Sequence, residues 1–513
     1  MNAETSEQPA HERDREATLL VFLAALAPRL WVALAWAKEP VWDGHYYDFG
    51  ARRIAAGLGY SDDLIVNGVS RWHPWCHYPV GYSGFLGLIY KVFGSGQSVA
   101  PLANALVGAT LAALVFLLAR TFLPLPRAAL AALLVALSPE LVTYTALLMT
   151  EPLASLGPFA AALAVLAFRT TRPLVGAALG GSLLGAAALV RPQSLLAVPA
   201  LAILYPFTDT HLSSTITRGK ITLVAAAAAL AVLLPWTARN CRVMDGCALV
   251  STNGGWNLAI GALPGATGRF RTLRAADGCP VVTGQVQQDR CWRDEALAVI
   301  RRDPQSWLAL VPKKLGNTFD HASFPMGYLG EADKARWSEA VKTQGRELLT
   351  AAHRALLALA CLAFVTVPRR GERSAAVWAA QGAKLALIAG LTLRGAWSDA
   401  HPFWPLAVLL PVLAMISLPG DGPSSRHPIV SFLAFQIAAL VCTHAVFFGE
   451  DRYHVVVTPV LALLAACGLR QLGPDPQRKR RGPDEGNQLS PRPGAAFAES
   501  PLASPCANAA DPE

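Results

Sequence analysis

Two acidic side chains stand directly beside long apolar runs of the sequence. Asp43 follows Trp42 at the end of the first run, and Glu151 lies in a short turn, Met149 to Pro152, between two later runs. An acid this close to an apolar layer is costly and is usually retained for a function. Both are therefore candidates for acid–base chemistry. The alternative is that each begins a helix and stabilises its N-terminus.

The segment that follows Asp43 is rich in aromatic residues and histidine. The helical period over residues 45–56 predicts an amphipathic helix lying on the membrane surface. Its lipid-facing side is expected to hold Tyr46, Phe49 and Ile54. Its water-facing side is expected to hold Asp48, Arg52 and Arg53. A carboxylate with aromatic and basic neighbours at a membrane surface suits a substrate with a lipid tail and an anionic head.

Several basic residues near the same face are candidates for binding the phosphate of such a substrate. Arginine forms bidentate contacts with phosphate oxygens, whereas lysine acts as a point charge. The alternative for each of them is that it simply ends its helix. The candidates are Arg191, Arg239, Lys313, Lys314 and Arg452.

A metal site is a weaker interpretation of the same region. His73 and His77 are four residues apart, with Cys76 between them, which is compatible with zinc on one helical face. Pro74 and Pro79 disfavour a regular helix there, so no metal ligand is assigned. The sequence contains no nucleotide-binding motif. We therefore expect no cofactor, with a divalent metal as the open alternative.

The composition indicates what must position these residues. The chain has 513 residues, of which 53% are hydrophobic and 15% charged, whereas roughly 25% are charged in a typical soluble domain. About twelve runs approach the ~20 apolar residues of a membrane helix. They are 19–37, 99–119, 128–148, 153–168, 174–190, 193–207, 221–238, 349–367, 375–393, 403–418, 429–448 and 452–470. This predicts an all-α polytopic membrane protein and excludes a disordered chain, a nucleic-acid-binding domain and a small disulfide-rich toxin.

Lysine and arginine in the short loops predict the orientation of these helices. With the N-terminus inside, the inner loops carry Arg120, Arg127, Arg169, Arg172, Arg218, Lys220, Arg369, Arg370, Arg373 and Arg426, and the outer loops carry only Arg191, Arg394 and Arg452. The prediction is a cytoplasmic N-terminus (1–18), a transmembrane domain (19–470) and a disordered cytoplasmic tail (471–513). Two long segments, about 38–98 and 239–347, then lie outside the cytoplasm and carry the polar chemistry.

The cysteines agree with this placement. Five of the nine lie in the two long outer segments, where disulfides persist. Their spacing favours two local pairs, Cys241–Cys247 and Cys279–Cys291. Free thiols are the alternative.

Several short motifs follow one another in a fixed order. Trp42-Asp43 and Tyr46-Tyr47 precede Tyr78-Pro79-Val80-Gly81-Tyr82 and the apolar segment 85–94. Later come Thr-Glu-Pro-Leu at 150–153, Leu-Val-Arg-Pro at 189–192, Pro-Trp-Thr-Ala-Arg-Asn at 235–240 and Asp-Arg-Tyr-His at 451–454. Their order and topology resemble the glycosyltransferase C superfamily. Within it the chain is similar to the protein O-mannosyltransferase and aminoarabinose transferase group, which is glycosyltransferase family 39-like.

The resemblance implies an enzyme of the cell (inner) membrane that moves a hexosyl or pentosyl group from a polyprenyl-phosphate donor. The acceptor would be a glycan, lipid or protein on the periplasmic or extracellular side, and the sugar would be inverted. Asp43 lies where the family's catalytic aspartate begins the first outer loop, and Glu151 is the second catalytic candidate. The leaving phosphate would contact Arg191, Lys313, Lys314 and Arg452. The sugar pocket would be lined by Tyr46, Tyr47, His73, His77 and Tyr78.

The chain departs from the family pattern at two places. The family often has Asp-Glu where this chain has Asp43-Gly44, and aminoarabinose transferases have Lys-Pro-Pro where this chain has Tyr78-Pro79-Val80. The acceptor therefore stays open. The alternative function is a transporter or flippase of lipid-linked sugars, which paired broken helices in the two halves would favour. Membrane lipids are expected partners and nucleic acid is not.

Overall fold

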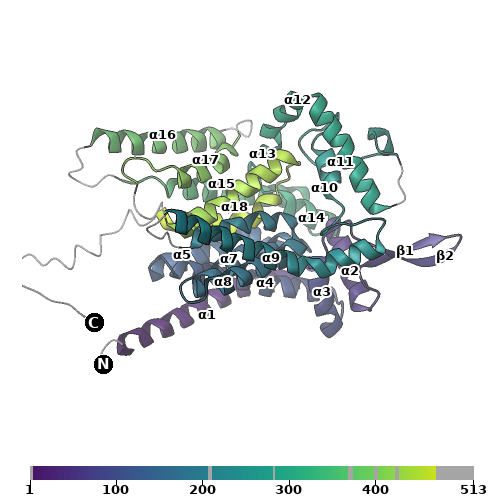
Figure 1. The fold of residues 1–513 in the computed structure, drawn as a ribbon, viewed down its shortest axis with the longest axis horizontal. Helices are drawn as coiled ribbons and strands as arrows, with labels where there is room; N and C mark the ends of the chain where they lie inside the picture. Colours follow the sequence, from purple (N-terminus) through teal and green to yellow (C-terminus); the bar gives the residue numbers. More distant parts are fainter. Residues whose placement is uncertain are drawn as a thin grey trace, which may run out of the picture. The chain divides into compact units, whose positions relative to one another are not determined.

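The computed structural model describes residues 4–205, 211–280, 284–367, 374–397, 402–421 and 427–468. These residues form helices almost throughout (Figure 1). The predicted tail 471–513 lies outside the described residues. All twelve apolar runs are helical for most of their described length, so the predicted all-α polytopic class is confirmed.

Seven of the described helices are long and apolar enough to cross a membrane, or eight if one bent pair counts as a span. The seven are α1 (Glu4–Ala35), α4 (Val99–Arg120), α7 (Glu151–Phe168), α8 (Pro173–Val190), α9 (His211–Val243), α16 (Ala375–Trp397) and α18 (Pro428–Val446). The bent pair joins α5 (Leu125–Ala136) at 47° to α6 (Pro139–Thr143) and η1 (Tyr144–Ala146).

The remaining apolar runs form shorter or more polar helices. These are η2 (Pro192–Ala197), η3 (Pro199–Leu204), α15 (Glu339–Leu362), α17 (Pro405–Met415), η5 (Tyr453–Val457) and α19 (Thr458–Gly468). Arg191 has extended backbone, so α8 ends at Val190 and a new turn begins at Pro192. The region 174–207 is therefore two elements with a break that places an arginine between them.

Small residues let the membrane helices pack closely. A Cβ on Gly181 of α8 would lie 2.1 Å from the Ala225 carbonyl oxygen of α9, and one on Gly185 would lie 2.6 Å from that of Ala229. Such contacts leave no room for a side chain, so glycine is required at both positions. Close approach of backbones through glycine and alanine is typical of membrane helices.

The first of the two predicted outer segments, about 38–98, contains α2 (Asp43–Ala55), a hairpin of β1 (Ser61–Val66) and β2 (Val69–Pro74), and α3 (Val80–Phe93). The strands are antiparallel with Val66 opposite Val69. Asn67 and Gly68 form the connection, with φ values of 52° and 77°. Two left-handed residues are what a two-residue hairpin turn of type I′ requires, and Asn-Gly is its preferred pair. The sequence analysis did not predict this hairpin.

The second outer segment is a series of short helices. They are α10 (Gly254–Ile260), η4 (Ala275–Asp277), α11 (Gln285–Arg302), α12 (Pro304–Ala309), α13 (Val311–Phe319) and α14 (Phe324–Ala332). Disulfides join Cys241 to Cys247 and Cys279 to Cys291, the two pairs that the spacing predicts. The Gln285 side chain accepts from the Cys76 amide at 2.9 Å, so the two outer segments contact each other.

Two charged residues of α2 differ from their expected environments. Asp48 and Arg53 are buried on α2 rather than facing water. Asp48 accepts hydrogen bonds from the Tyr90 hydroxyl at 2.5 Å and from Arg52 Nε at 2.6 Å. Arg53 pairs with Asp63 at 2.7 Å. The prediction of a solvated face is right for Arg52, which is exposed, and wrong for Asp48 and Arg53, because α3 and the hairpin cover them and supply their partners.

Arg29 lies inside α1 and is fully buried. It donates to the carbonyl oxygens of Ala25 at 2.8 Å, Ala136 at 2.6 Å and Val135 at 3.1 Å. The last two belong to the open C-terminus of α5, where carbonyls lack partners within the helix. Backbone carbonyls therefore accept from both terminal nitrogens of this guanidinium, while Nε has no partner among the described residues.

Candidate active site

Asp43 is the first residue of α2 and projects between two distant parts of the chain. The Tyr78 hydroxyl donates to Asp43 Oδ1 at 2.8 Å, and Arg452 donates to Oδ2 at 2.5 Å. Its side chain is 22% exposed. Both carboxylate oxygens are thus held in place while part of the side chain remains open.

Arg452 lies in the segment 450–452, whose neighbouring side chains contact different helices. The carboxylate of Asp451 accepts from the Ser323 and Phe324 amides at the start of α14, at 2.5 and 2.9 Å. Arg452 also lies 2.8 Å from Glu450 and over the Phe324 ring at 5.0 Å. The arginine is therefore fixed between two carboxylates, those of Asp43 and Glu450.

The pKa values of the two carboxylates that flank Arg452, Asp43 and Glu450, are shifted in opposite directions. Burial alone would raise the pKa of Asp43, but the charge of Arg452 and the hydrogen bonds from Arg452 and Tyr78 outweigh it, so the pKa lies below its ordinary value. Burial raises the pKa of Glu450, and Arg452 only partly offsets this. Pairs of acidic groups whose pKa values are shifted in opposite directions are typical of active sites. Asp43 is ionised at neutral pH.

Sequence reasoning missed Glu450. It stands next to the Asp-Arg-Tyr-His motif, and an acid three residues ahead of a helix in an apolar context was the available signal.

Aromatic side chains surround the bond between Tyr78 and Asp43. The Tyr78 ring lies 5.7 Å from that of Tyr46, 5.4 Å from that of Tyr47 and 4.9 Å from that of His77. Burial lowers the pKa of His77, although the Asp43 charge opposes this, so the imidazole is neutral at pH 7. Aromatic faces and a neutral imidazole are suitable for contacting a sugar. Four of the five residues predicted to line a sugar pocket therefore gather here.

The fifth, His73, lies elsewhere. It is on β2, and its Nδ1 lies 2.6 Å from Asp62 on β1. Cys76 is buried beside Thr252, and His77 packs against Trp256. The three residues of the zinc alternative thus have different partners in the described part of the chain.

Glu151 is the first residue of α7 and is fully buried. Arg191, in the break after α8, donates to Glu151 Oε1 at 2.7 Å and to the Thr150 hydroxyl at 3.1 Å. The guanidinium of Arg191 lies 5.2 Å from the Tyr453 ring centroid, and that of Arg452 lies 5.1 Å from it. The two candidate phosphate-binding arginines therefore meet at one aromatic ring.

A small cleft opens beside Arg191. Its walls come from α7, η2, α18, η5 and α19, and they are mostly apolar. Arg191 and Gln193 supply polar groups to the lining. Arg191 Nε is buried and has no hydrogen-bond partner among the described residues. The N–H of Arg191 Nε is therefore available to donate a hydrogen bond to a bound ligand.

The other predicted phosphate ligands lie in different surroundings. Lys314 is buried and donates to the carbonyl oxygens of Ala445 at 3.4 Å and Val446 at 3.0 Å, at the end of α18. Burial lowers its pKa to about 8. Lys313 is exposed. Arg239 donates to the carbonyl oxygens of Trp75 and Tyr60. Of the five predicted phosphate ligands, Arg452 contacts Asp43 directly, and Arg191 lies on the same Tyr453 ring as Arg452.

Comparisons with known proteins give a family match and a set of similar structures. A search of curated proteins finds no match to this chain. Several solved structures are similar at low identity, and two of them serve as examples. The apo oligosaccharyltransferase of Archaeoglobus fulgidus has a TM-score of 0.45 and 13% identity over 89% of this chain and 50% of its own. ArnT from Cupriavidus metallidurans, bound to undecaprenyl phosphate, has a TM-score of 0.34 and 14% identity over 89% of this chain and 77% of its own.

The chain spans about half the length of the archaeal structures that it matches. The family model described as dolichyl-phosphate-mannose-protein mannosyltransferase matches residues 77–238. This segment carries His77, Tyr78, Glu151 and Arg191, and it ends before the Asp-Arg-Tyr-His motif. The resemblance expected from the motifs is therefore confirmed: residues 77–238 match the dolichyl-phosphate-mannose-protein mannosyltransferase family.

Proposed function

We propose that this protein is a glycosyltransferase that moves a sugar from a polyprenyl-phosphate donor to an acceptor hydroxyl at the outer face of the membrane. The observation that carries the proposal is the Asp43 carboxylate, held by Tyr78 and Arg452 and still partly exposed, beside a second arginine at an apolar cleft. A base, cationic groups for a phosphate and an apolar channel are the three parts that such a transfer needs.

The donor would place its phosphate near Tyr453, between the two guanidinium groups. The free Nε–H of Arg191 and the positive charge of Arg452 favour an anion there. The polyprenyl tail would enter the cleft between α7 and α18, whose lining is mostly apolar. Arg191 thus marks the boundary between the polar and the apolar part of the donor site.

The reaction follows from these positions. The Asp43 carboxylate takes the proton of the acceptor hydroxyl while the hydroxyl oxygen attacks the anomeric carbon. The bond from that carbon to the phosphate oxygen breaks, and polyprenyl phosphate leaves with the electron pair on the side opposite the attack. The configuration is therefore inverted. The two arginines stabilise the charge that develops on the phosphate, and the base contributes about 10²–10⁴-fold.

Release of polyprenyl phosphate in detergent solution tests this function. Full-length protein is incubated with membrane extract containing radiolabelled polyprenyl-phosphate sugars, and the products are followed by chromatography and mass spectrometry. Wild-type protein should move label to an acceptor and free the lipid phosphate. A transporter would leave the donor intact, because detergent solution offers no membrane to cross. Asp62→Asn, which alters a hairpin acid, is the control for Asp43→Asn.

Labelling of introduced cysteines tests the outer-face placement. A cysteine at Asp62 on β1 should react with a membrane-impermeant reagent in intact cells. A cysteine at Arg172, in the short connection before α8, should react only after permeabilisation. The reverse pattern would contradict the proposed location of the site.

A further inference from the structure

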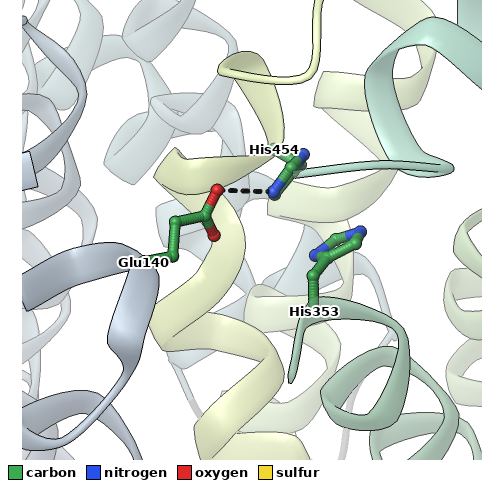
Figure 2. Close-up of side chains that lie close together, drawn as sticks. All are labelled: Glu140, His353 and His454. Atoms are coloured by element: carbon green, nitrogen blue, oxygen red, sulfur yellow. Dashed lines mark hydrogen bonds and ion pairs between the residues drawn. The ribbon is translucent and has the colours of Figure 1, made fainter. Parts of the chain in front are cut away.

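A separate cluster of three polar side chains lies in the helical core. Glu140 of α6, His353 of α15 and His454 of η5 come from elements far apart in the sequence (Figure 2). All three are buried, with 3%, 4% and 0% exposure. His454 Nε2 lies 2.9 Å from Glu140 Oε1, and the two imidazole centroids are 3.8 Å apart. One potential ligand atom from each residue lies within 4.8 Å of the other two.

The outer nitrogen of each imidazole is already committed. His454 Nδ1 lies 2.7 Å from the Thr318 carbonyl oxygen, and His353 Nε2 lies 3.0 Å from that of Phe319. A carbonyl oxygen only accepts, so these nitrogens carry the hydrogens. The neutral rings then present lone pairs on His454 Nε2 and His353 Nδ1. Histidines that bind metals show this arrangement, in which a backbone carbonyl fixes the tautomer.

A metal cation would satisfy these lone pairs together. His454 Nε2 and Glu140 Oε1 are both acceptors and face each other at 2.9 Å. A proton between them would satisfy that pair alone. It would leave His353 Nδ1, which is buried and has no hydrogen-bond partner in the described residues, unsatisfied. One metal ion satisfies all three atoms.

We propose that Glu140, His353 and His454 form a binding site for a divalent transition metal of the zinc class. Two imidazole nitrogens and a carboxylate oxygen are a zinc ligand set, whereas calcium and magnesium prefer oxygen alone. Zinc binds such atoms at about 2.0–2.2 Å, so two ligands of a tetrahedral ion lie roughly 3.4 Å apart. The three ligand atoms lie within 4.8 Å of one another, so the side chains have to adjust to bind one ion.

The ion positions the segment that carries Arg452. His454 lies two residues after Arg452, and the ion connects this segment to α6 and α15. It lies among the packed helices, apart from the Asp43 carboxylate, and acts through the chain. This effect on Arg452 rests on the proposed function, whereas the metal site itself does not.

Metal analysis of full-length protein, purified in detergent without chelator, tests the site. Wild-type protein should contain about one zinc per chain, and His353→Gln should lower this at least tenfold. His444→Gln is the matched control, because His444 is equally buried and its Nδ1 donates to the Phe448 carbonyl oxygen at 2.9 Å rather than facing the cluster. It should keep the metal. Wild-type protein that binds no zinc, even after zinc is added, would overturn the proposal, as would equal loss in both variants.

A second measurement covers variants that fail to fold. Wild-type protein stripped with a chelator and loaded with Co²⁺ should show the visible absorption of tetrahedral cobalt, and His353→Cys should add a sulfur-to-cobalt band. The lack of both would overturn the site. Chelation should also lower the thermal midpoint and reduce sugar transfer, and zinc should restore both. If transfer is never observed, metal content and the cobalt spectrum still decide the site while the proposed function fails.

Discussion

Asp43 and Glu151 each pair with an arginine at the ring of Tyr453, yet their surroundings differ. Asp43 is 22% exposed and is held by residues far away in the sequence, Tyr78 and Arg452. Glu151 is fully buried and is held by Arg191 with Thr150 alongside. An exposed carboxylate can meet an acceptor hydroxyl, whereas an enclosed one can only hold its arginine. The comparison supports Asp43 as the proposed base and favours a positioning role for Glu151.

The largest expected effect is on turnover in Asp43→Asn. Asparagine keeps an oxygen for Tyr78 but cannot take a proton, so transfer should fall by about 10²–10⁴-fold. Thermal stability in detergent should change little. Initial rates of release of polyprenyl phosphate measure the effect, with Asp62→Asn as control. Near-normal transfer by a folded Asp43→Asn protein would remove Asp43 from the mechanism.

Glu151→Gln should act on stability more than on chemistry. It leaves the guanidinium of Arg191 buried without its counter-charge, and breaking such a pair costs about 3–5 kcal/mol. Thermal unfolding in detergent measures this, with the exposed Glu331→Gln as control. Turnover of the folded fraction should fall less than in Asp43→Asn. A stable Glu151→Gln protein with the larger loss of turnover would reverse the two roles.

Asp48→Asn adds a third acid to the comparison of Asp43 and Glu151, and this one lies on α2, as Asp43 does. Asp48 accepts from Tyr90 and Arg52 in a buried position, so the variant should lose about 1.5 kcal/mol of stability. Transfer per folded molecule should persist, since the side chain faces α3 and not Tyr78. Chemical unfolding of purified protein gives the stability, and the same rate assay gives the transfer. Loss of transfer in a fully stable variant would contradict this placement.

The smallest effect is a shift in pH dependence. Arg452 holds the pKa of Asp43 below its ordinary value, so wild-type transfer is present above that depressed pKa and is lost only as the pH falls through it. In Arg452→Gln the pKa should rise, and transfer should be lost at a higher pH. The position of the acid limb of kcat/KM, not its height, is the measurement. An unchanged limb would mean that another acid is the base.

The sequence predicted the elements better than their contacts. Long apolar runs give helices because each must satisfy its backbone internally in lipid. Of the amphipathic helix predicted over 45–56, residues 45–55 lie in α2. The predicted exposure of Asp48 and Arg53 on α2 was wrong. Hydrophobic periodicity depends only on which residues are polar, so it cannot show that Asp48 contacts Tyr90 or that Arg53 contacts Asp63. The hairpin had a local signal, Asn67-Gly68, that was overlooked.

The sequence predicted those residues of the candidate site that lie close together in one segment. Asp43, Tyr46, Tyr47, His77 and Tyr78 lie within 36 residues and gather around one hydrogen bond. Pairings across the chain were not predictable. Nothing in the spacing indicates that Arg452 meets Asp43 or that Lys314 turns to the end of α18. Such contacts depend on how the helices pack.

Arg29 imposes an order on synthesis. Its guanidinium is satisfied by the carbonyls of Val135 and Ala136, which the ribosome adds 106 and 107 residues later. At about 5–20 residues per second, this delay is roughly 5–20 s. During that time α1 carries a charge that lipid does not solvate, so the nascent first helix has to wait at a polar boundary. Its final insertion therefore depends on the arrival of α5, and truncated nascent chains that stop before Val135 should be the ones that fail to hold α1 in the bilayer.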